Sequence, residues 1–182
     1  MKTLLDSKKF NVVIQRLAHQ LIENHGDFSQ SVIIGIQPRG VLLANRLVDY
    51  LQVNRSLKLK YGKLDITFYR DDFNKGNQLI PDQTDINFSI EAKKVILVDD
   101  VLYTGRTIRS ALDAILDFGR PDKVELVTLI DRRYSRHLPI QADYIGMTVD
   151  ALISEKVKVY WAENEGEDKV VLLNNVIEKP KK

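Results

Sequence analysis

The 182-residue chain contains no cysteine. Disulfides, thiolate nucleophiles and cysteine-based metal sites are therefore excluded. The absence agrees with a reducing compartment, so we expect a cytoplasmic protein. Residues 1–9 lack the apolar stretch of a signal peptide, and no apolar run reaches the length of a membrane span. We therefore expect neither secretion nor a membrane partner.

An excess of charge of one sign is also lacking. The 27 Lys and Arg residues nearly balance the 25 Asp and Glu residues, which leaves a net charge of +2. This balance does not indicate a strongly basic nucleic-acid binder, although it allows a local basic patch. The length suits one globular domain, which we place at residues 1–178, with a disordered tail at residues 179–182.

Apolar periodicity predicts strands that alternate with helices. The predicted strands cover residues 32–36, 57–61, 64–69, 95–98, 124–130, 157–161 and 169–173. The predicted helices cover residues 10–22, 41–51 and 106–118. The first of them has Ser7 as its predicted cap and should end near Gly26. Such succession implies right-handed parallel crossovers, so we expect an α/β fold with a mainly parallel central sheet and helices on both faces. The polar residues 70–87 are expected to form a mobile loop or hairpin.

The most informative segment is Val95–Thr107, which begins with an apolar strand and continues into two carboxylates. Asp99 and Asp100 follow the strand at its carboxyl end, where open α/β sheets bind their ligands. Adjacent carboxylates repel each other unless a cation or hydroxyl donors stabilise both. A lone Asp-Asp pair is typical of a solvated turn, but the buried strand before it favours a ligand site.

The turn after the carboxylates has the composition of a phosphate cradle. Thr104 is a candidate N-cap, and Gly105 allows a ligand to approach the backbone closely. The next helix offers free amides and the positive end of its dipole, while Arg106 and Thr107 add charge and a hydroxyl. A ligand with a phosphate at one end and a diol or Mg²⁺ at the other fits both halves, as a sugar 5-phosphate does.

A second glycine-containing turn follows the strand at residues 32–36. It consists of Gln37, Pro38, Arg39 and Gly40. The glycine spacing matches a Walker A loop, but positions 41 and 42 are Val and Leu, so a nucleoside triphosphate loop is excluded. The turn suits an anion pocket, and a plain strand-to-helix turn is the alternative.

Two further candidate sites lie at predicted strand ends. Arg70 begins the polar loop and can clamp an anion when the loop closes, although a solvated hairpin has the same composition. Asp131 and Arg132 end the strand at residues 124–130, on the same sheet edge as Asp99. We interpret them as residues near a base or a metal, with simple strand termination as the alternative.

Residues 95–107 resemble the phosphoribosyl-pyrophosphate signature of the type I phosphoribosyltransferases. More of the chain is similar to one branch, the PyrR family of pyrimidine operon attenuators with uracil phosphoribosyltransferase activity. The matching segments are collinear and cover residues 16–19, 35–40, 64–72, 117–121 and 138–146. The resemblance implies the type I fold with a small hood, which we place at residues 131–161, and a homodimer or higher homo-oligomer.

The resemblance also implies the reaction, in which uracil and phosphoribosyl pyrophosphate give UMP and pyrophosphate. Asp99, Asp100 and Arg70 are then catalytic, and the two aspartates contact Mg²⁺ directly or through water. Residues 37–40 become the pyrophosphate loop, for which we predict a cis Gln37–Pro38 bond. The remaining substrate-binding residues are Val101, Leu102, Tyr103, Thr104, Gly105, Arg106 and Thr107, together with Asp131 and Arg132 near the base.

Two other functions stay open. The first is a UMP-responsive RNA-binding attenuator, for which Arg16, His19 and Arg136 match the family's RNA face. However, Gln141 and Met147 stand where attenuating members are expected to be basic, and each lost phosphate contact weakens binding. The second is a transferase for another base, because the signature fixes only the donor. A phosphoribosyl-pyrophosphate synthetase shares a similar signature but is usually a much longer, duplicated chain.

Overall fold

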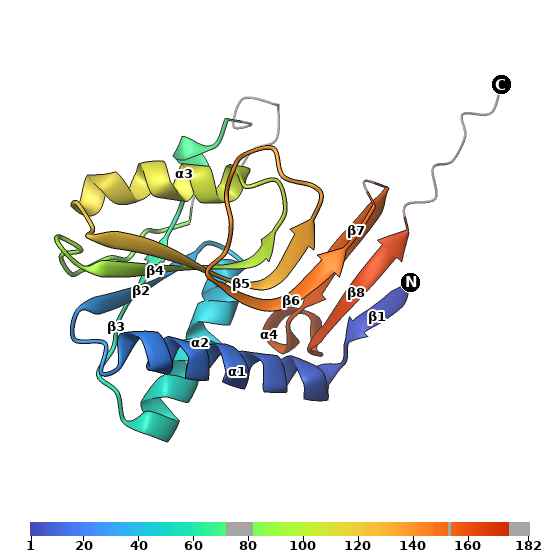
Figure 1. Ribbon diagram of the computed structural model, residues 1–182, viewed down its shortest axis with the longest axis horizontal. Helices are drawn as coiled ribbons and strands as arrows, with labels where there is room; N and C mark the ends of the chain where they lie inside the picture. The colour runs from blue at the N-terminus through green and yellow to red at the C-terminus, as the bar shows by residue number, and fades with distance from the viewer. Residues whose placement is uncertain (72–81, 153, 175–182) are drawn as a thin grey trace.

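The computed structural model describes residues 1–71, 82–152 and 154–174. Its main sheet has five strands, all parallel (Figure 1). In spatial order they are β3 (Lys60–Leu64), β2 (Ser31–Ile36), β4 (Lys94–Leu102), β5 (Lys123–Arg133) and β6 (Tyr144–Asp150). Because the strands are parallel, their carboxyl ends share one edge of the sheet, which is where ligands bind in such folds.

Helices cover both faces of this sheet (Figure 1). α1 (Ser7–His25) and α2 (Gly40–Arg55) lie on one face, and α3 (Arg106–Ile115) lies on the other. Each face has its own hydrophobic core, and all residues of β2 are buried. The predicted α/β class with a doubly covered parallel sheet is therefore confirmed, because buried parallel strands need apolar side chains on both faces.

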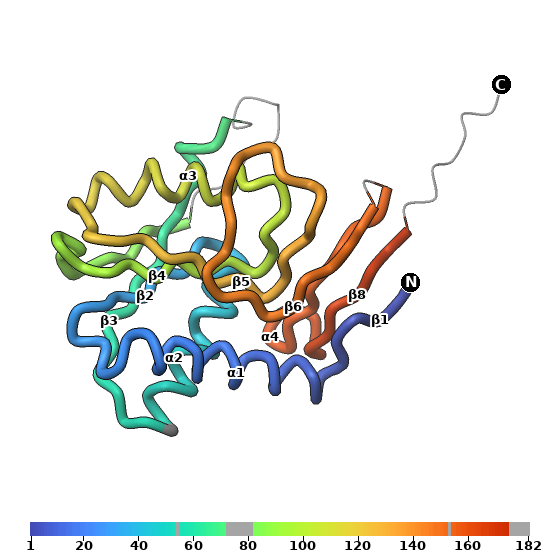
Figure 2. The backbone as a smooth tube through the Cα atoms, viewed as in Figure 1, coloured from blue at the N-terminus to red at the C-terminus, as the bar shows by residue number. Residues whose placement is uncertain are grey.

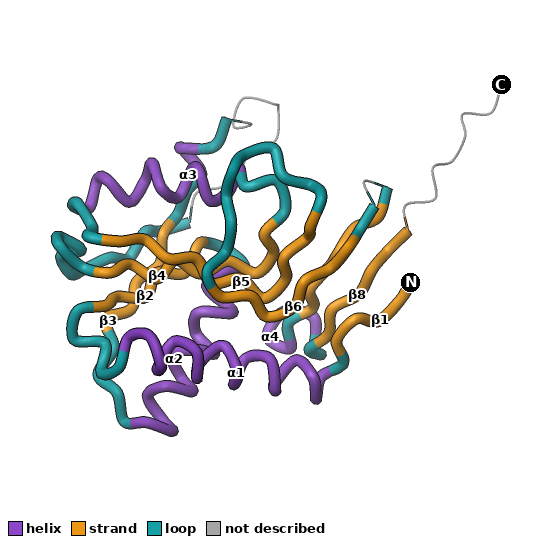
Figure 3. The backbone as a smooth tube through the Cα atoms, viewed as in Figure 1, coloured by secondary structure: helices purple, strands orange, loops and turns teal. Residues whose placement is uncertain are grey.

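A second sheet is antiparallel and joins the two ends of the described chain (Figures 2 and 3). It contains β1 (Lys2–Leu5), β8 (Lys169–Asn174) and β7 (Glu155–Tyr160), in that order, and the short helix α4 (Ala162–Glu165) lies between β7 and β8. β7 and β8 correspond to the strands predicted at residues 157–161 and 169–173, and Gly166 lies in the connection between them. The segment that we expected to form the hood differs, because residues 131–150 include the end of β5 and all of β6 in the main sheet.

A buried tryptophan anchors the second sheet to the helices. Trp161 follows β7, is fully buried, and meets Phe10 of α1 edge to face with 5.1 Å between ring centroids. The Arg46 guanidinium lies 5.4 Å from the centroid of the Trp161 ring and binds Asp168 and Glu163. Aromatic and cation–π contacts of this kind hold the sheet on α1 and α2.

Several predicted boundaries were wrong for local reasons. The two strands expected at residues 57–61 and 64–69 are a single strand, β3, followed by the 3₁₀ turn η1 (Thr67–Tyr69). The Asp65 carboxylate accepts hydrogen bonds from the Thr67 amide at 3.0 Å and hydroxyl at 2.6 Å, which turns the chain out of the sheet. Asp6, not Ser7, is the N-cap of α1, because its side chain accepts from the Lys9 amide at 2.9 Å.

The remaining differences concern elements that the sequence pattern did not indicate. β1 and β6 were missed, and α3 ends in the 3₁₀ turn η2 (Leu116–Phe118). The central part of the loop expected at residues 70–87, and the tail expected at residues 179–182, lie outside the described residues. No helix in the described part of the chain is long and apolar enough to cross a bilayer.

Candidate active site at the carboxyl edge of the sheet

Strand β4 carries both aspartates of the signature, and it continues past them to Leu102. The strand therefore does not end at Val98, as the apolar pattern suggested. Side chains alternate along a strand, so neighbouring aspartates point to opposite faces. Asp99 lines a pocket on the α3 side, whereas Asp100 binds Arg39 at the start of α2.

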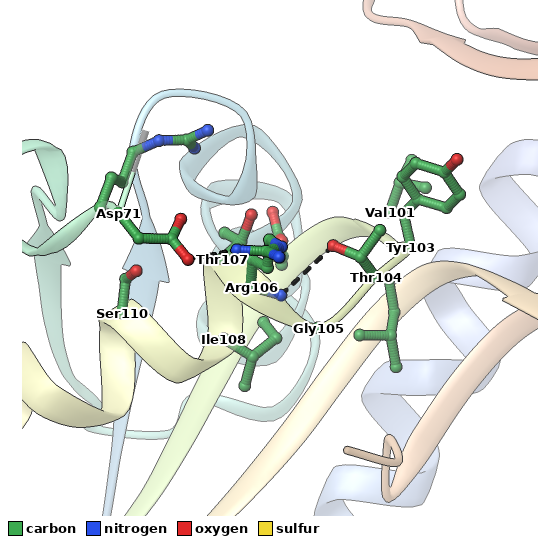
Figure 4. Close-up of a pocket in the computed structure, with 12 residues that line it drawn as sticks. Asp71, Val101, Tyr103, Thr104, Gly105, Arg106, Thr107, Ile108 and Ser110 are labelled. Carbon is green, nitrogen blue, oxygen red and sulfur yellow. Dashed lines mark hydrogen bonds and ion pairs between the residues drawn. The ribbon is translucent and has the colours of Figure 1, made fainter. Parts of the chain in front are cut away.

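The pocket joins the end of β4 to the start of α3 (Figure 4). It contains most of the predicted substrate-binding residues, and the side chains of Arg106 and Thr107 gather near its centre. Three lining residues were not predicted, although Ile108 and Ser110 are close to Thr107 on α3. The lining consists of Arg70, Asp71, Asp99, Val101, Leu102, Tyr103, Thr104, Gly105, Arg106, Thr107, Ile108 and Ser110.

The turn that opens α3 has the geometry of an anion site. Gly105 is the N-cap, with φ +90°, a conformation that a side chain would strain. Thr104 is therefore not the cap that the sequence suggested, although its hydroxyl oxygen accepts from the Arg106 amide at 3.4 Å. The amino end of α3, with its positive dipole, opens onto the pocket and suits a phosphate group.

Arg136 binds the backbone that leads into this turn. Its guanidinium donates to the carbonyls of Leu102 (3.2 Å) and Tyr103, and it forms an ion pair with Asp131. The Thr104 carbonyl in turn accepts from the His137 amide at 3.0 Å. We assigned Arg136 to an RNA face, but its N–H groups bind partners within the protein. Asp131, which we placed near a base or a metal, forms an ion pair with Arg136 and does not line the pocket.

The predicted pyrophosphate loop lies against the same strand. The Gln37–Pro38 bond is cis, which confirms that prediction. A Cβ atom on Gly40 would lie 2.3 Å from the Val98 carbonyl oxygen, so only glycine lets the loop pack this closely on β4. The Gln37 amide donates to the Leu64 carbonyl at 2.9 Å, which ties the loop to β3.

Arg39 connects this loop to the second sheet. Its Nε lies 2.8 Å from Oδ2 of Asp100, and its other nitrogens reach the Val159 carbonyl and, at 3.4 Å, the Glu165 carboxylate. The loop at residues 37–40 does not line the pocket that contains Asp99. Asp100 therefore connects the loop at residues 37–40 to the strand that leads into the turn at residues 104–107, the two segments that we predicted to bind anions.

Burial dominates the electrostatics of the aspartate pair. Asp99 is 7% exposed and Asp100 is 8% exposed. Burial, followed by the negative charge of Asp100, raises the pKa of Asp99 to about 8. Burial also raises the pKa of Asp100, against the hydrogen bond and charge of Arg39. Charge on both carboxylates is thus unfavourable until a cation or hydroxyl donors reach them.

The other predicted residues lie around this centre. Arg70 lines the pocket, and Arg106 forms an exposed ion pair with Asp71. Arg132 is buried and lies under the Tyr103 ring, outside the pocket lining. No cluster of three or more acidic or histidine side chains that could hold a metal ion is found among residues 1–71, 82–152 and 154–174.

The two candidate RNA residues on α1 lie on the sheet face opposite α3. Arg16 donates hydrogen bonds to the carbonyls of Ile145 (3.3 Å) and Gly146, and Arg16 is nevertheless exposed to solvent. A ring nitrogen of His19 lies 3.1 Å from the Tyr50 hydroxyl. The structure thus separates these residues from the pocket.

Comparison with known proteins agrees with this fold. Residues 1–164 match the family described as the phosphoribosyl transferase domain. The fold also matches solved hypoxanthine phosphoribosyltransferases. One, from Trypanosoma cruzi, has a TM-score of 0.72 and 18% identity over 96% of this chain and 97% of its own. Another, from Staphylococcus aureus, has a TM-score of 0.70 and 22% identity over 95% and 92%. The chain belongs to the type I phosphoribosyltransferases.

Curated relatives narrow the family further. A Desulfosudis oleivorans protein named "Bifunctional protein PyrR" is 50% identical over 93% of this chain and 94% of its own. A protein of the same name from Gloeothece citriformis is 43% identical over 93% and 96%. Within the type I class, this chain is a member of the PyrR family.

We predict that Asp99→Asn stabilises the protein at neutral and higher pH. Because folding raises the pKa of Asp99, the folded state holds a proton that the unfolded state loses above about pH 4, so the wild-type free energy of unfolding falls as pH rises toward 8. The Asn variant should gain about 1–3 kcal/mol at pH 8 and almost nothing near pH 4. Urea titrations at both pH values measure this.

The matched control is Asp113→Asn, because Asp113 is an exposed aspartate on α3. It should change the free energy of unfolding by less than about 0.5 kcal/mol at either pH. A gain for Asp99→Asn that is equal at pH 4 and pH 8 would contradict a proton-linked origin.

We also predict that Arg136→Ala loosens the turn that opens α3. Removing the guanidinium leaves Asp131 and several carbonyls without their donor, which should cost about 2–4 kcal/mol of folding free energy. Arg133→Ala is the control, because its ion pair with Asp150 is exposed to solvent and should contribute little to the folding free energy. Equal losses in urea unfolding of the two variants would disprove the bracing contact.

Proposed function

We propose that this chain transfers the phosphoribosyl group of phosphoribosyl pyrophosphate to uracil, which gives UMP and pyrophosphate. The observation that carries the proposal is the single pocket in which a buried carboxyl, Asp99, faces the amino end of α3. Membership of the PyrR family supports uracil as the acceptor.

The proposed donor, phosphoribosyl pyrophosphate, fits the pocket with its 5-phosphate toward α3 and its ribose toward the aspartates. Its 5-phosphate would lie on the turn at residues 104–107, where backbone amides and hydroxyls can donate to it. The ribose hydroxyls would then reach Asp99 and Asp100 and donate to their carboxylates. Hydroxyl donors would stabilise the charged form of carboxylates whose pKa values are raised by burial.

The chemistry requires no protein nucleophile. The acceptor nitrogen attacks the anomeric carbon while pyrophosphate leaves, and the ribose ring gains positive charge in the transition state. Ionised carboxylates beside the ring stabilise that charge, and fixed geometry provides the remainder. Residues 37–40 and Arg70 would hold the leaving pyrophosphate.

Mg²⁺ fits this donor set as an ion that arrives with the substrate. It is usually held by one or two carboxylates together with phosphates and water, so a dedicated protein cage is unnecessary. Asp99 and Asp100 would hold it directly or through water. The bound ion would supply positive charge next to the pyrophosphate and the ribose hydroxyls.

The decisive assay follows pyrophosphate release from the donor with uracil, hypoxanthine, guanine or orotate. We expect release with uracil alone, and a loss of at least about 100-fold when Asp99 and Asp100 are both changed to Asn, because the charge opposite the cationic ring disappears. Asp113→Asn serves as the control. Release with a different base would make this a transferase for that base, and no release with any base would refute the proposal.

A second, UMP-responsive RNA-binding activity is supported by the exposed Arg16 on α1 and by the name of the relatives. Arg136 is committed to internal carbonyls, so the basic face keeps fewer free cations than the sequence suggested. Arg16 on α1 lies outside the lining of the pocket that contains Asp99, so one chain could carry both activities.

Filter binding to a pyrimidine leader RNA across a salt series tests this second activity. Arg16→Gln should weaken binding and flatten the salt slope by about 0.7–0.9, which corresponds to one lost phosphate contact. Arg109→Gln, on the opposite α3 face, should leave the slope unchanged. Binding by the wild type that is weak and insensitive to salt would rule out this activity.

A further inference from the structure

Tyr103 differs from the other residues of the turn that lines the pocket. Its neighbours from Thr104 to Thr107 are small, hydroxylated or cationic, whereas Tyr103 brings a flat aromatic ring, and the residue is 40% exposed. Its hydroxyl makes no hydrogen bond within the described segments. A phosphate needs amide or cationic donors, so this ring suits a different part of the substrate.

A buried cation supports the Tyr103 ring from below. The Arg132 guanidinium lies 4.0 Å from the ring centroid, and Arg132 is only 4% exposed. Its Nη2 donates to the carbonyls of Glu155 (3.0 Å) and Leu152 (3.4 Å) at the start of β7. The Tyr103 ring therefore packs against a guanidinium that is itself held in place, while the residue as a whole stays partly exposed.

The place of the ring in the fold also points to the acceptor. Pairing of β4 with β5 puts Leu102 beside Asp131, so Tyr103 leaves the main sheet next to Arg132 and the second sheet. In the close-up, Tyr103 lies beyond Thr104 and far from Asp71 and Ser110 on the other side of the pocket (Figure 4). The ring is thus at the edge of the site that faces β7, away from the Arg70 side.

We propose that the acceptor pyrimidine stacks on Tyr103, and that Arg132 is the positioning residue that holds this ring in place. The inference rests on the proposed function and names the part of the pocket that takes the flat, uncharged partner. The phosphate cradle, the acidic pair and this platform then bind the three chemically distinct parts of the nucleotide product. Stacking tolerates many flat rings, so this platform, the Tyr103 ring held by Arg132, contributes affinity for the base. Specificity for one base must come from contacts elsewhere in the site.

The test compares KM for uracil with KM for the donor in variants of the platform. Tyr103→Leu should raise KM for uracil at least tenfold and leave KM for the donor within twofold, because base stacking on an aromatic side chain is worth about 1–3 kcal/mol. Tyr103→Phe keeps the ring and should stay within about threefold of the wild type. Arg132→Lys, which loses the planar stack, should have an intermediate KM for uracil.

Tyr134→Leu is the matched control. Tyr134 is 81% exposed, contacts Arg133 and lies outside the pocket lining, so both KM values should be unchanged. UMP affinity, measured by calorimetry without turnover, gives an independent readout and should fall at least tenfold in Tyr103→Leu only.

The outcomes separate the two proposals. An inactive wild type that binds UMP through Tyr103 would overturn the transferase assignment and keep the platform. An active wild type whose KM for uracil and UMP affinity survive Tyr103→Leu would overturn the platform and keep the transferase. Equal increases in both KM values, or a wild type that does not bind UMP, would also overturn the platform.

Discussion

Asp99 and Asp100 leave β4 on opposite faces, and both carboxylates are buried. This arrangement fixes most of what surrounds them. One carboxylate needs a ligand on the α3 side, and the other needs a cation on the α2 side, which Arg39 supplies at 2.8 Å. Two exposed aspartates would be solvated by water on either face and would require no particular partner there. The raised pKa values express the same constraint, because charge at this point is stable only when partners arrive.

Two arginines connect the strand that carries the aspartate pair to the loops around it. Arg39 links the turn at residues 37–40 to Asp100 and to the second sheet, and Arg136 holds the turn that opens α3 through the carbonyls of Leu102 and Tyr103. Neither arginine needs to touch the donor to matter. Both fix backbone that would otherwise be free to move, and preorganised geometry of this kind is what a reaction without a protein nucleophile requires.

Sequence reasoning predicted the parts of this fold that have a strong local signal. The buried strand before Asp99 and the glycine at the start of α3 each follow from nearby residues. The cis Gln37–Pro38 bond followed from the resemblance to the family's pyrophosphate loop together with the proline at position 38. Sequence reasoning misplaced elements whose identity depends on distant contacts. β6 is recognisable only once β5 is in place, β1 pairs with a strand near the other end of the chain, and the side-chain bonds of Asp65 end β3 early. The same limit explains Arg136, which looks like a free surface cation until the carbonyls that it binds come together.

The pairing of β1 with β8 has a consequence for biosynthesis. Residues 2–5 leave the ribosome long before their strand partner at residues 169–174, so the small sheet cannot close until residues 169–174 have been synthesised. All strands of the five-stranded sheet lie before residue 151, so they are synthesised before β7 and β8. The Arg39 contacts to Val159 and Glu165 therefore form only after β7 and α4 have been synthesised, whereas the Arg39–Asp100 contact requires neither element.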